Sequence, residues 1–425
     1  MLLIKHYMKK ISFQLFPFLL ALLFVFPILK ENWSSIIVIV ICLNTIVYKI
    51  VAKDYTWPSK TALWLTIPFW IIALRSLFST NWSESTTHIQ HALFFLILPL
   101  FFFFIPKEHF SKQKIALYIT ILKFTCLAIG IIYVVSFFMN YSVSEFFIVF
   151  QNVSSFRNYV YFDFTLFKIH PTYYTTLLVF CTAHSFDLVL QQRKYSHFLF
   201  VIAFMLLSIM LLTRLNIVLL VLTLTLMVFF RSKLKLKQML LLSGGILALT
   251  VVISLLTPGI KHRFVELYHS FDVKPQSVAY DSTNIRRAIF DCSVAIAKDN
   301  FWFGVGFENL QDQLNTCYRD NYDSSFYDGH NYMTHNYFFY ILVSGGIFCL
   351  AFFLFYLTTI VRIAWKSKNF LFKVFLINVM VIWFIEDYLY RHYGILYFNL
   401  LLICFIRYTE NQNPEKEAAT NSVSA

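Results

Sequence analysis

The sequence predicts an all-α integral membrane protein with about twelve transmembrane helices and one large hydrophilic loop. Three observations predict this class. Of the 425 residues, 59% are hydrophobic and only 13% are charged, against roughly one-quarter charged in soluble domains. Apolar runs of about 17–25 residues, the length that crosses a ~30 Å hydrocarbon layer, recur along nearly the whole chain. Basic residues gather in alternate linkers between these runs.

Nine of the predicted spans lie in residues 1–257, and three lie in residues 335–407. The large hydrophilic loop, residues 258–334, separates the two groups. The acidic, Asn-rich tail at residues 408–425 is expected to be disordered. The spans are expected at 11–29, 34–52, 61–79, 88–106, 115–139, 171–190, 197–213, 215–230, 238–257, 335–361, 370–387 and 393–407.

The basic linkers set the expected orientation of the spans. Lys53 and Lys60 lie in the linker after the second span, and Lys233, Lys235 and Lys237 precede the ninth. Because basic loops stay on the cytoplasmic side of a membrane, both termini are expected to be cytoplasmic and the large loop is expected on the outer side. The formal charge of +13 is spread over these linkers, which argues for contact with the lipid bilayer and against nucleic-acid binding.

Two of the seven cysteines, Cys292 and Cys317, lie in the large loop. Disulfides persist in oxidising compartments, so these two would pair if the loop is periplasmic, and the sequence leaves that pairing open. The other five lie in apolar runs, where a cysteine is usually a small packing residue.

The loop contains one predicted amphipathic helix, at residues 284–300. Its apolar residues recur at helical spacing, and residues 281–284 offer capping side chains before it. Gly304 and Gly306 follow, and such glycines end a helix and let the backbone approach a ligand closely. A helix with one apolar face outside the bilayer is expected to rest on the membrane surface, where a lipid-linked substrate presents its head group.

Four arginines are candidates for binding an anionic group on the outer side. Arg214 lies in the seam between two apolar runs, where an arginine either snorkels to the interface or grips phosphate oxygens with two donors. Arg286 and Arg287 stand near the start of the loop helix, where the helix dipole disfavours cations, so an anion or acidic lipid head groups are expected beside them. Arg263 is a weaker candidate of the same kind.

Histidines at the outer ends of two spans are the candidate acid–base groups. His330 and His335 are each followed by asparagine, and His335–Asn336 opens the tenth span. A histidine at the aqueous end of a helix can act as a general base near neutral pH, although a lone interfacial histidine is more often structural. His170 opens the sixth span before a proline, and helix initiation explains that pair equally well.

Acidic residues on the outer side are few. Glu386 and Asp387 close the eleventh span, and the sequence allows them to pair with the nearby Arg391 and His392. No carboxylate or cysteine completes a familiar metal-ligand set with the histidines at 330 and 335, so no metal site is expected.

Three local patterns resemble the O-antigen ligase and O-antigen polymerase superfamily of bacterial envelope enzymes. Thr213–Arg214, at the end of an apolar run, is similar to the arginine that the family has at that point. Residues 286–306 resemble the family's loop pattern of an arginine, an aromatic four residues on, a short amphipathic helix and Gly-x-Gly. His335–Asn336, followed by the glycine-rich run 344–347, is the most specific of the three.

The resemblance implies a GT-C-like architecture and a glycosyltransferase that needs no metal or other cofactor. Such an enzyme transfers a glycan from undecaprenyl diphosphate to an acceptor hydroxyl, here expected to be on lipid A-core, at the periplasmic face of the inner membrane. His335 would orient or deprotonate that hydroxyl, while Arg214 and a loop arginine neutralise charge on the departing diphosphate. The aromatic Phe290, four residues after Arg286, favours Arg286 over Arg287.

Two related reactions and one function of another class remain open. A polysaccharide polymerase and a protein O-oligosaccharyltransferase would use the same donor and site with a glycan or a protein as acceptor. A flippase or transporter of the lipid-linked glycan would also have about twelve spans, but it should carry charged residues inside them. The middle of most predicted spans is apolar, so we expect a glycosyltransferase and, among the three reactions, a ligase.

Overall fold

The computed structural model describes residues 2–150, 153–270, 282–322, 327 and 329–412. In this part of the chain, the strands are β1 (Val149–Phe150) and β2 (Val153–Ser154), which form one short antiparallel ladder. The helices are α1 (Leu2–Leu23), η1 (Phe26–Ile28), α2 (Glu31–Ala52), α3 (Lys60–Leu65), α4 (Ile67–Ser76), α5 (Trp82–Phe102), η2 (Lys107–Phe110), α6 (Lys112–Asn140), α7 (Val143–Phe146), α8 (Ser155–Asn158), η3 (Tyr159–Asp163), α9 (Pro171–Gln192), α10 (His197–Met210), α11 (Arg214–Arg231), α12 (Leu236–Leu256), α13 (Ile260–Ser270), α14 (Ser282–Asp299), α15 (Leu310–Asn321), α16 (Tyr337–Lys366), α17 (Phe370–Trp383), η5 (Tyr388–Tyr390) and α18 (His392–Gln412).

Six of the described helices are long and apolar enough to cross a membrane: α2, α5, α6, α11, α12 and α16. The helices α4, α10 and α17 are apolar but shorter. The fold is that of an all-α, multi-pass membrane protein. Among the described residues, length and composition identify these six helices as candidate spans. The count of about twelve spans therefore stays a prediction.

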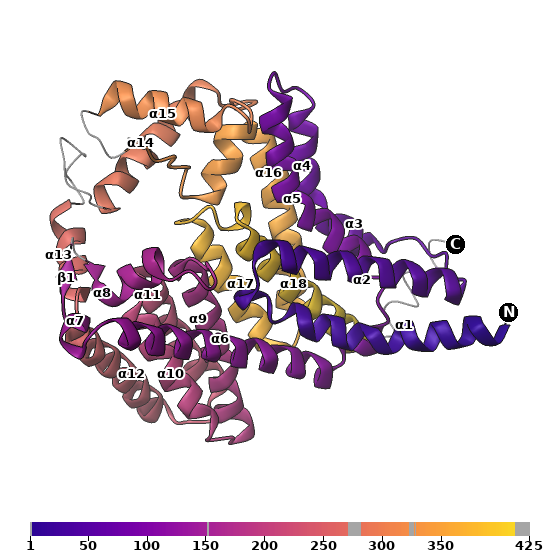
Figure 1. Cartoon of the computed structure of the whole chain (residues 1–425), viewed down its shortest axis with the longest axis horizontal. Coiled ribbons are helices and arrows are strands. Elements are labelled where there is room, and N and C mark those ends of the chain that lie inside the picture. The colour runs from indigo at the N-terminus through magenta and orange to yellow at the C-terminus, as the bar shows by residue number, and fades with distance from the viewer. Residues whose placement is uncertain (1, 151–152, 271–281, 323–326, 328, 413–425) are drawn as a thin grey trace.

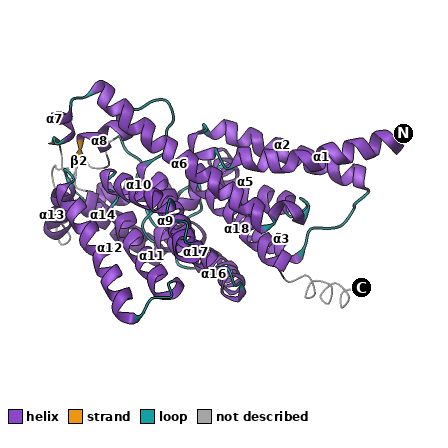
Figure 2. Cartoon of the chain, turned by 90° about the horizontal axis from the view of Figure 1, so that it is seen from below, coloured by secondary structure: helices purple, strands orange, loops and turns teal. Residues whose placement is uncertain are grey.

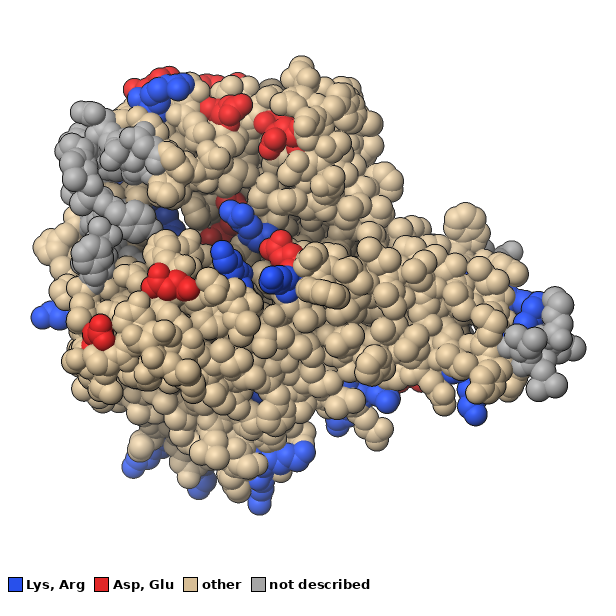
Figure 3. Space-filling view, in the orientation of Figure 1, with Lys and Arg blue, Asp and Glu red and all other residues tan. Residues whose placement is uncertain are grey.

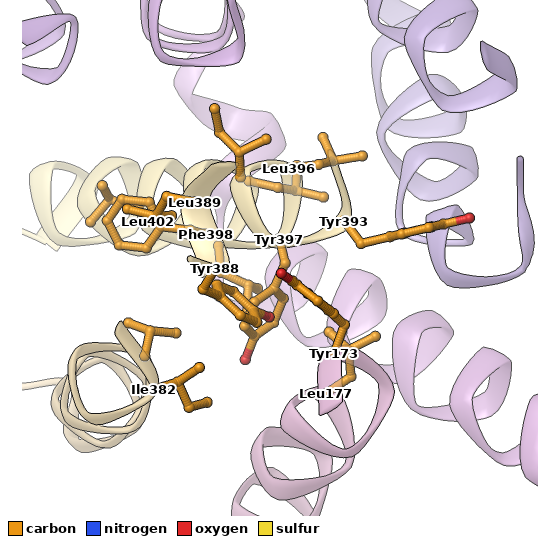
Figure 4. Packing of buried hydrophobic residues seen from close by; sticks show 14 of the residues in the cluster. Tyr173, Leu177, Ile382, Tyr388, Leu389, Tyr393, Leu396, Tyr397, Phe398 and Leu402 are labelled. Carbon is orange, nitrogen blue, oxygen red and sulfur yellow. The ribbon is translucent and has the colours of Figure 1, made fainter. Parts of the chain in front are cut away.

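The core of the molecule is built around α18, in which every residue from Tyr393 to Arg407 is buried. Figure 1 shows α14 and α15 at the top, beside the first part of α16, and α10 and α12 at the bottom. Figure 2 shows α1 and α2 side by side, extending away from the remaining helices. In Figure 4, Tyr397 and Phe398 of α18 pack near Tyr173 of α9 and Ile382 of α17. The helices that carry the predicted site residues are therefore tied to one apolar core.

The third predicted span is divided into α3 and α4 by a proline. Pro68 is the second residue of α4 and has no backbone N–H to donate into the preceding turn. The N–H of Thr66 instead bonds to the carbonyl of Leu63, which closes α3. The two short helices replace the single helix that hydropathy predicts.

The tenth predicted span, α16, is a broken helix. Gly346 inside it has φ of +72° and ψ of −175°, a conformation that side chains with a Cβ rarely adopt. A Cβ at this position would overlap the carbonyl of Trp302, which packs directly on the break. Glycine is required here by both the backbone angle and the close approach of a second segment.

The Gly-x-Gly segment fills this break. Val305 N–H donates to the carbonyl of Val343 at 2.8 Å, and Gly306 N–H donates to the carbonyl of Ser344 at 2.9 Å. A Cβ on Gly304 would overlap the backbone at Ser344. We expected these glycines to bring backbone close to a ligand; instead they bring it against α16 and satisfy carbonyls that the helix break exposes.

The predicted loop helix is α14, and its apolar face packs on protein. The helix contacts α13, α15 and α16. Its buried apolar positions are Ile285, Ala288, Ile289, Cys292, Ile296 and Ala297. The expectation that this face rests on lipid is wrong, because neighbouring helices cover it. A disulfide between Cys292 and Cys317 joins α14 to α15 and resolves the pairing that the sequence left open.

Candidate active site

His335 lies in the turn that leads into α16, with a left-handed φ of +45°. Asn336 is the N-cap of α16, and its Oδ1 accepts from the N–H of Phe338 at 2.9 Å and of Phe339 at 3.1 Å. Asp387, between α17 and α18, accepts from the N–H of His335 at 2.8 Å and of Asn336 at 3.1 Å. The left-handed conformation of His335 costs roughly 1–3 kcal/mol in a residue other than glycine. The hydrogen bonds to Asp387 stabilise the turn in this conformation.

Asp387 organises this turn from a buried position. Its Oδ1 also accepts from the hydroxyl of Thr334 at 2.6 Å. Burial raises the pKa of the Asp387 carboxyl, while the charge of His335 and the hydrogen bonds to the carboxyl act in the opposite direction. The group is engaged on both oxygens, which suits a structural role beside the candidate base.

Glu386 joins the candidate base to a candidate diphosphate ligand. Its Oε2 lies 3.4 Å from His335 Nδ1, and its Oε1 accepts from Arg286 Nη2 at 3.1 Å. Burial by itself raises the pKa of the Glu386 carboxyl, but the hydrogen bond and charge of His335, with the charges of Arg286 and His170, outweigh it and lower the pKa to about 2. Glu386 is therefore an anion at neutral pH, and it lies between Arg286 and His335.

The two loop arginines have different partners. Arg286 contacts Glu386, whereas Arg287 Nε lies 4.0 Å from Asp291 on the same helix. Arg286 Nε is buried and finds no hydrogen-bond partner among the described residues. Arg286 therefore binds one carboxylate and has a further buried N–H donor. That donor is suited to a second anion, such as a phosphate oxygen.

Arg214 is the first residue of α11 and reaches the start of α14. Its Nη2 donates to Ser282 Oγ at 2.9 Å, and its Nη1 donates to Thr283 Oγ1 at 3.3 Å. Arg286 lies about one helical turn further along α14. The first turn of α14 therefore links the Arg214 side chain to the group formed by Arg286, Glu386 and His335.

The remaining candidates lie around this group or outside it. His170 is the N-cap of α9, and its Nδ1 accepts from the N–H of Thr172 at 3.2 Å. Burial lowers the pKa of His170 to about 4, although the negative charge of Glu386 opposes the shift. His330 is exposed, and its ring faces that of a neighbouring tyrosine. The side chain of Arg263, in α13, lies outside the described part of the structure.

The local pairing that the sequence allowed at residues 386–392 is not how these side chains interact. Glu386 and Asp387 face the start of α16, as described above. The guanidinium of Arg391 lies over the ring of Tyr390, 5.7 Å from its centroid. His392 Nε2 lies 2.6 Å from Ser34 Oγ in α2. The two carboxylates thus belong to the candidate site, and their neighbours Arg391 and His392 contact other residues.

Figure 3 shows where charge gathers on the face seen in Figure 1. Acidic and basic side chains line a hollow in the middle of this face, below the position of α14 and α15, and the surface around the hollow is largely uncharged. A polar substrate would meet the otherwise apolar molecule at this hollow.

Arg157, in α8, is a contributor that the sequence did not reveal. Its Nη1 donates to the carbonyls of Leu211 at 2.7 Å and Leu212 at 2.9 Å, just before Arg214. These contacts join residues more than 50 positions apart. No periodic or local pattern in one sequence carries such information; only the position of Arg157 in a segment outside the predicted spans pointed toward this side of the molecule.

A family model described as O-antigen ligase matches residues 176–354. This part of the chain is similar to O-antigen ligases. The match confirms the resemblance to the superfamily and includes Arg214, Arg286, Arg287 and His335. The family comprises glycosyltransferase-like ligases and polymerases that act on lipid-linked glycans.

Several residues at or near the candidate site lie outside the matched residues. Arg157 and His170 precede the matched residues, and Glu386 and Asp387 follow them. Among curated proteins, none matches the chain.

Proposed function

We propose that the protein is an O-antigen ligase-type glycosyltransferase of a bacterial inner membrane. It transfers a glycan from an undecaprenyl-diphosphate-linked donor to a hydroxyl of lipid A-core at the periplasmic face. The observation that carries the proposal is the bridge made by Glu386, which lies 3.4 Å from His335 Nδ1 and 3.1 Å from Arg286 Nη2. One carboxylate thereby holds a candidate base beside a candidate diphosphate ligand.

In this proposal His335 is the general base. A carboxylate only accepts hydrogen bonds, so His335 Nδ1 carries the proton toward Glu386 and Nε2 remains an acceptor. Nε2 takes the proton of the acceptor hydroxyl while the hydroxyl oxygen attacks the anomeric carbon of the donor glycan. The bond from that carbon to the diphosphate oxygen breaks, its electron pair leaves with the polyprenyl diphosphate, and His335 later returns its proton to solvent.

Arg214 and Arg286 stabilise the charge that develops on the departing diphosphate. The Arg214 side chain contacts the first turn of α14, Arg286 follows about one turn later, and guanidinium groups match phosphate oxygens with paired N–H donors. Two such cations take the place that a divalent metal holds in many other phosphate-leaving reactions. Removing a donor of this kind typically costs about 10²–10³ in kcat.

The proposed topology has about twelve spans, nine in residues 1–257 and three in residues 335–407. Both termini lie in the cytoplasm, and residues 258–334 form the periplasmic loop that carries α14. The disulfide between Cys292 and Cys317 supports this orientation, because disulfides persist in the periplasm and are rare in the cytoplasm.

The test is a transfer assay with purified protein. Undecaprenyl-diphosphate glycan is supplied together with a chelator, and lipid A-core, a second lipid-linked glycan, or a peptide is offered in turn. A ligase glycosylates lipid A-core, a polymerase extends the second glycan, and a protein O-oligosaccharyltransferase modifies the peptide. Movement of the donor across vesicles with no product would identify a flippase and remove the proposal.

The assay is repeated with His335→Ala, Arg214→Ala and Arg286→Ala. Each is expected to abolish transfer while leaving expression and membrane insertion intact. Arg319→Ala is the matched control, because Arg319 is an exposed arginine of α15 that pairs with its neighbour Asp320. Near-normal transfer by the His335 and Arg214 variants would contradict the catalytic assignment.

A further inference from the structure

Arg157 is a cation beside the candidate site that the proposed mechanism does not use. It is the third residue of α8, and its backbone N–H donates to Ser154 Oγ, the N-cap of that helix, at 3.3 Å. We infer that Arg157 is a positioning residue for Arg214 and therefore for the diphosphate of the donor. This inference rests on the proposed function, because the role of Arg214 in holding the diphosphate is part of that proposal.

The guanidinium of Arg157 caps the end of α10. Its Nη1 donates to the carbonyls of Leu211 and Leu212, the two residues that follow α10. Carbonyls at the end of a helix have no partner within the helix and carry partial negative charge, so a cation is favoured there. Arg214 begins α11 two residues later, and the cap fixes the backbone from which the Arg214 side chain starts.

The turn that Arg157 caps is strained. Leu212 has φ of +53°, a left-handed conformation that is unfavourable for a residue with a Cβ. Its side chain is buried with Ile209, Ile217 and Ile260 in a small apolar cluster. That cluster supports the turn through apolar contacts, and Arg157 supports it through hydrogen bonds to the carbonyls of Leu211 and Leu212.

The start of α11 is held independently by α9. Thr213 Oγ1 donates to Thr175 Oγ1 at 3.0 Å, and Asn216 Nδ2 donates to the carbonyl of Thr172 at 3.0 Å. Loss of Arg157 would therefore relax the turn without unfolding α11. The expected consequence is a shift of Arg214 relative to the first turn of α14, and a misplacement of about 1 Å at a reacting group can cost ~10²-fold in rate.

The test measures donor KM and kcat for the wild type, Arg157→Met, Arg157→Lys, Arg214→Met and the Arg157→Met/Arg214→Met double variant. Arg157→Met is expected to lower kcat/KM for the donor by about 10- to 100-fold, and Arg157→Lys, which can still donate to a carbonyl, is expected to lower it by less. If Arg157 acts through Arg214, the double variant is no worse than Arg214→Met alone, because neighbouring groups in one network are not additive.

Two outcomes overturn the inference. Losses that simply add in the double variant would mean that Arg157 acts separately from Arg214, and an unchanged kcat/KM for the donor in Arg157→Met would mean that Arg157 does not act on the donor at all. Hydrogen exchange at residues 211–217 gives a readout besides activity, and faster exchange in Arg157→Met is expected. Absence of transfer by the wild type would instead overturn the proposed function, and the exchange data would still report whether Arg157 holds the turn.

Discussion

Each oxygen of the Glu386 carboxylate faces one partner, so the two roles of this residue are separable. Oε1 accepts from Arg286 and Oε2 faces His335 Nδ1. In Glu386→Gln, an amide NH₂ replaces one of these oxygens. Its N–H donors then face the N–H donor of Arg286 or of His335, so that hydrogen bond is lost. We expect transfer to fall by about 10²-fold, mainly in kcat, because the candidate base loses its orientation. Steady-state kinetics of the purified variant checks this.

Glu84→Gln is the control for that substitution, since Glu84 is an exposed carboxylate in the first turn of α5. It should transfer glycan like the wild type. If Glu386→Gln matched the control, His335 would be oriented by something other than Glu386.

His170 predicts a pH dependence of stability. The folded-state pKa of about 4 lies below the ordinary value of 6.5, so the folded protein resists protonation that the unfolded chain accepts. The stability that neutral His170 contributes is present above pH 6.5 and is lost as the pH falls from 6.5 toward 4. Asparagine also caps helices well and does not titrate, so the drop in Tm between pH 7.5 and 5 should be smaller in His170→Asn than in the wild type. Equal drops would show that other groups cause the acid sensitivity.

Local spacing carried part of the information at the residue level. The four-residue step from Arg286 to Phe290 favoured Arg286, and Arg286 is the loop arginine that contacts Glu386. The roles of Asp387 and Arg157 arise from contacts across about 50 residues, which a single sequence does not encode in any short pattern. The catalytic assignments themselves stay predictions.

Among the elements, the break in α16 makes the clearest mutational case. At Gly346 an alanine would meet both an unfavourable φ of +72° and the carbonyl of Trp302. Gly346→Ala should therefore push the 301–306 segment away and lower Tm by several degrees, in line with a backbone cost of roughly 1–3 kcal/mol. Thermal unfolding in detergent measures this. Gly244→Ala, where nothing lies within 4 Å of the added Cβ, should leave Tm nearly unchanged or raise it.

The disulfide is the second element-level test. Cys292 and Cys317 are 25 residues apart and tie α14, which carries Arg286, to α15. Replacing both with serine removes the tether and should cost about 2–4 kcal/mol of stability. The matched control is Cys349→Ser, which changes a free thiol in α16. Maleimide labelling of the unfolded wild type should modify five cysteines before reduction and seven after it, and seven before reduction would exclude the bridge.

Hydropathy located the apolar helices but not their interruptions. A run of apolar residues has the same hydropathy whether it forms one helix or two. Hydropathy alone therefore does not predict that the helices are interrupted near Pro68 and at Gly346. The apolar face of α14 was visible from its periodicity, but periodicity does not say whether lipid or protein covers that face. The structure answers by placing α15 and α16 against it.

At the scale of the whole molecule, the break in α16 suggests where the bilayer begins. Residues 347–366, after the break, extend about 30 Å at ~1.5 Å per residue, which is the thickness of the hydrocarbon layer. The rings of Trp302 and Phe303, exposed by 59% and 70%, lie against Phe348 at the break. Exposed aromatic side chains at one level are typical of the membrane–water interface.

If the interface lies at the break, residues 337–345 stand outside the hydrocarbon and hold His335 roughly 14 Å above it, at ~1.5 Å per residue. That height would place the candidate base beyond the lipid phosphates, where the sugar of a lipid-linked donor emerges. The position of Trp302 relative to the bilayer is therefore a test of how the whole molecule sits over its substrate.

The contribution of Trp302 to fluorescence is the difference between the wild type and Trp302→Phe in liposomes. We expect that contribution to be quenched strongly by lipids brominated high on the acyl chain and only weakly by aqueous iodide. Trp57, which is 90% exposed in the linker between α2 and α3, is the control, and its contribution is measured with Trp57→Phe. We expect that contribution to be quenched strongly by aqueous iodide and only weakly by brominated lipid. Strong iodide quenching of Trp302 without quenching by brominated lipid would move the interface away from the break, because a ring buried among acyl chains is shielded from a water-soluble anion. The candidate site would then sit at a different height, and the first sugar of the donor would no longer be the group that meets His335.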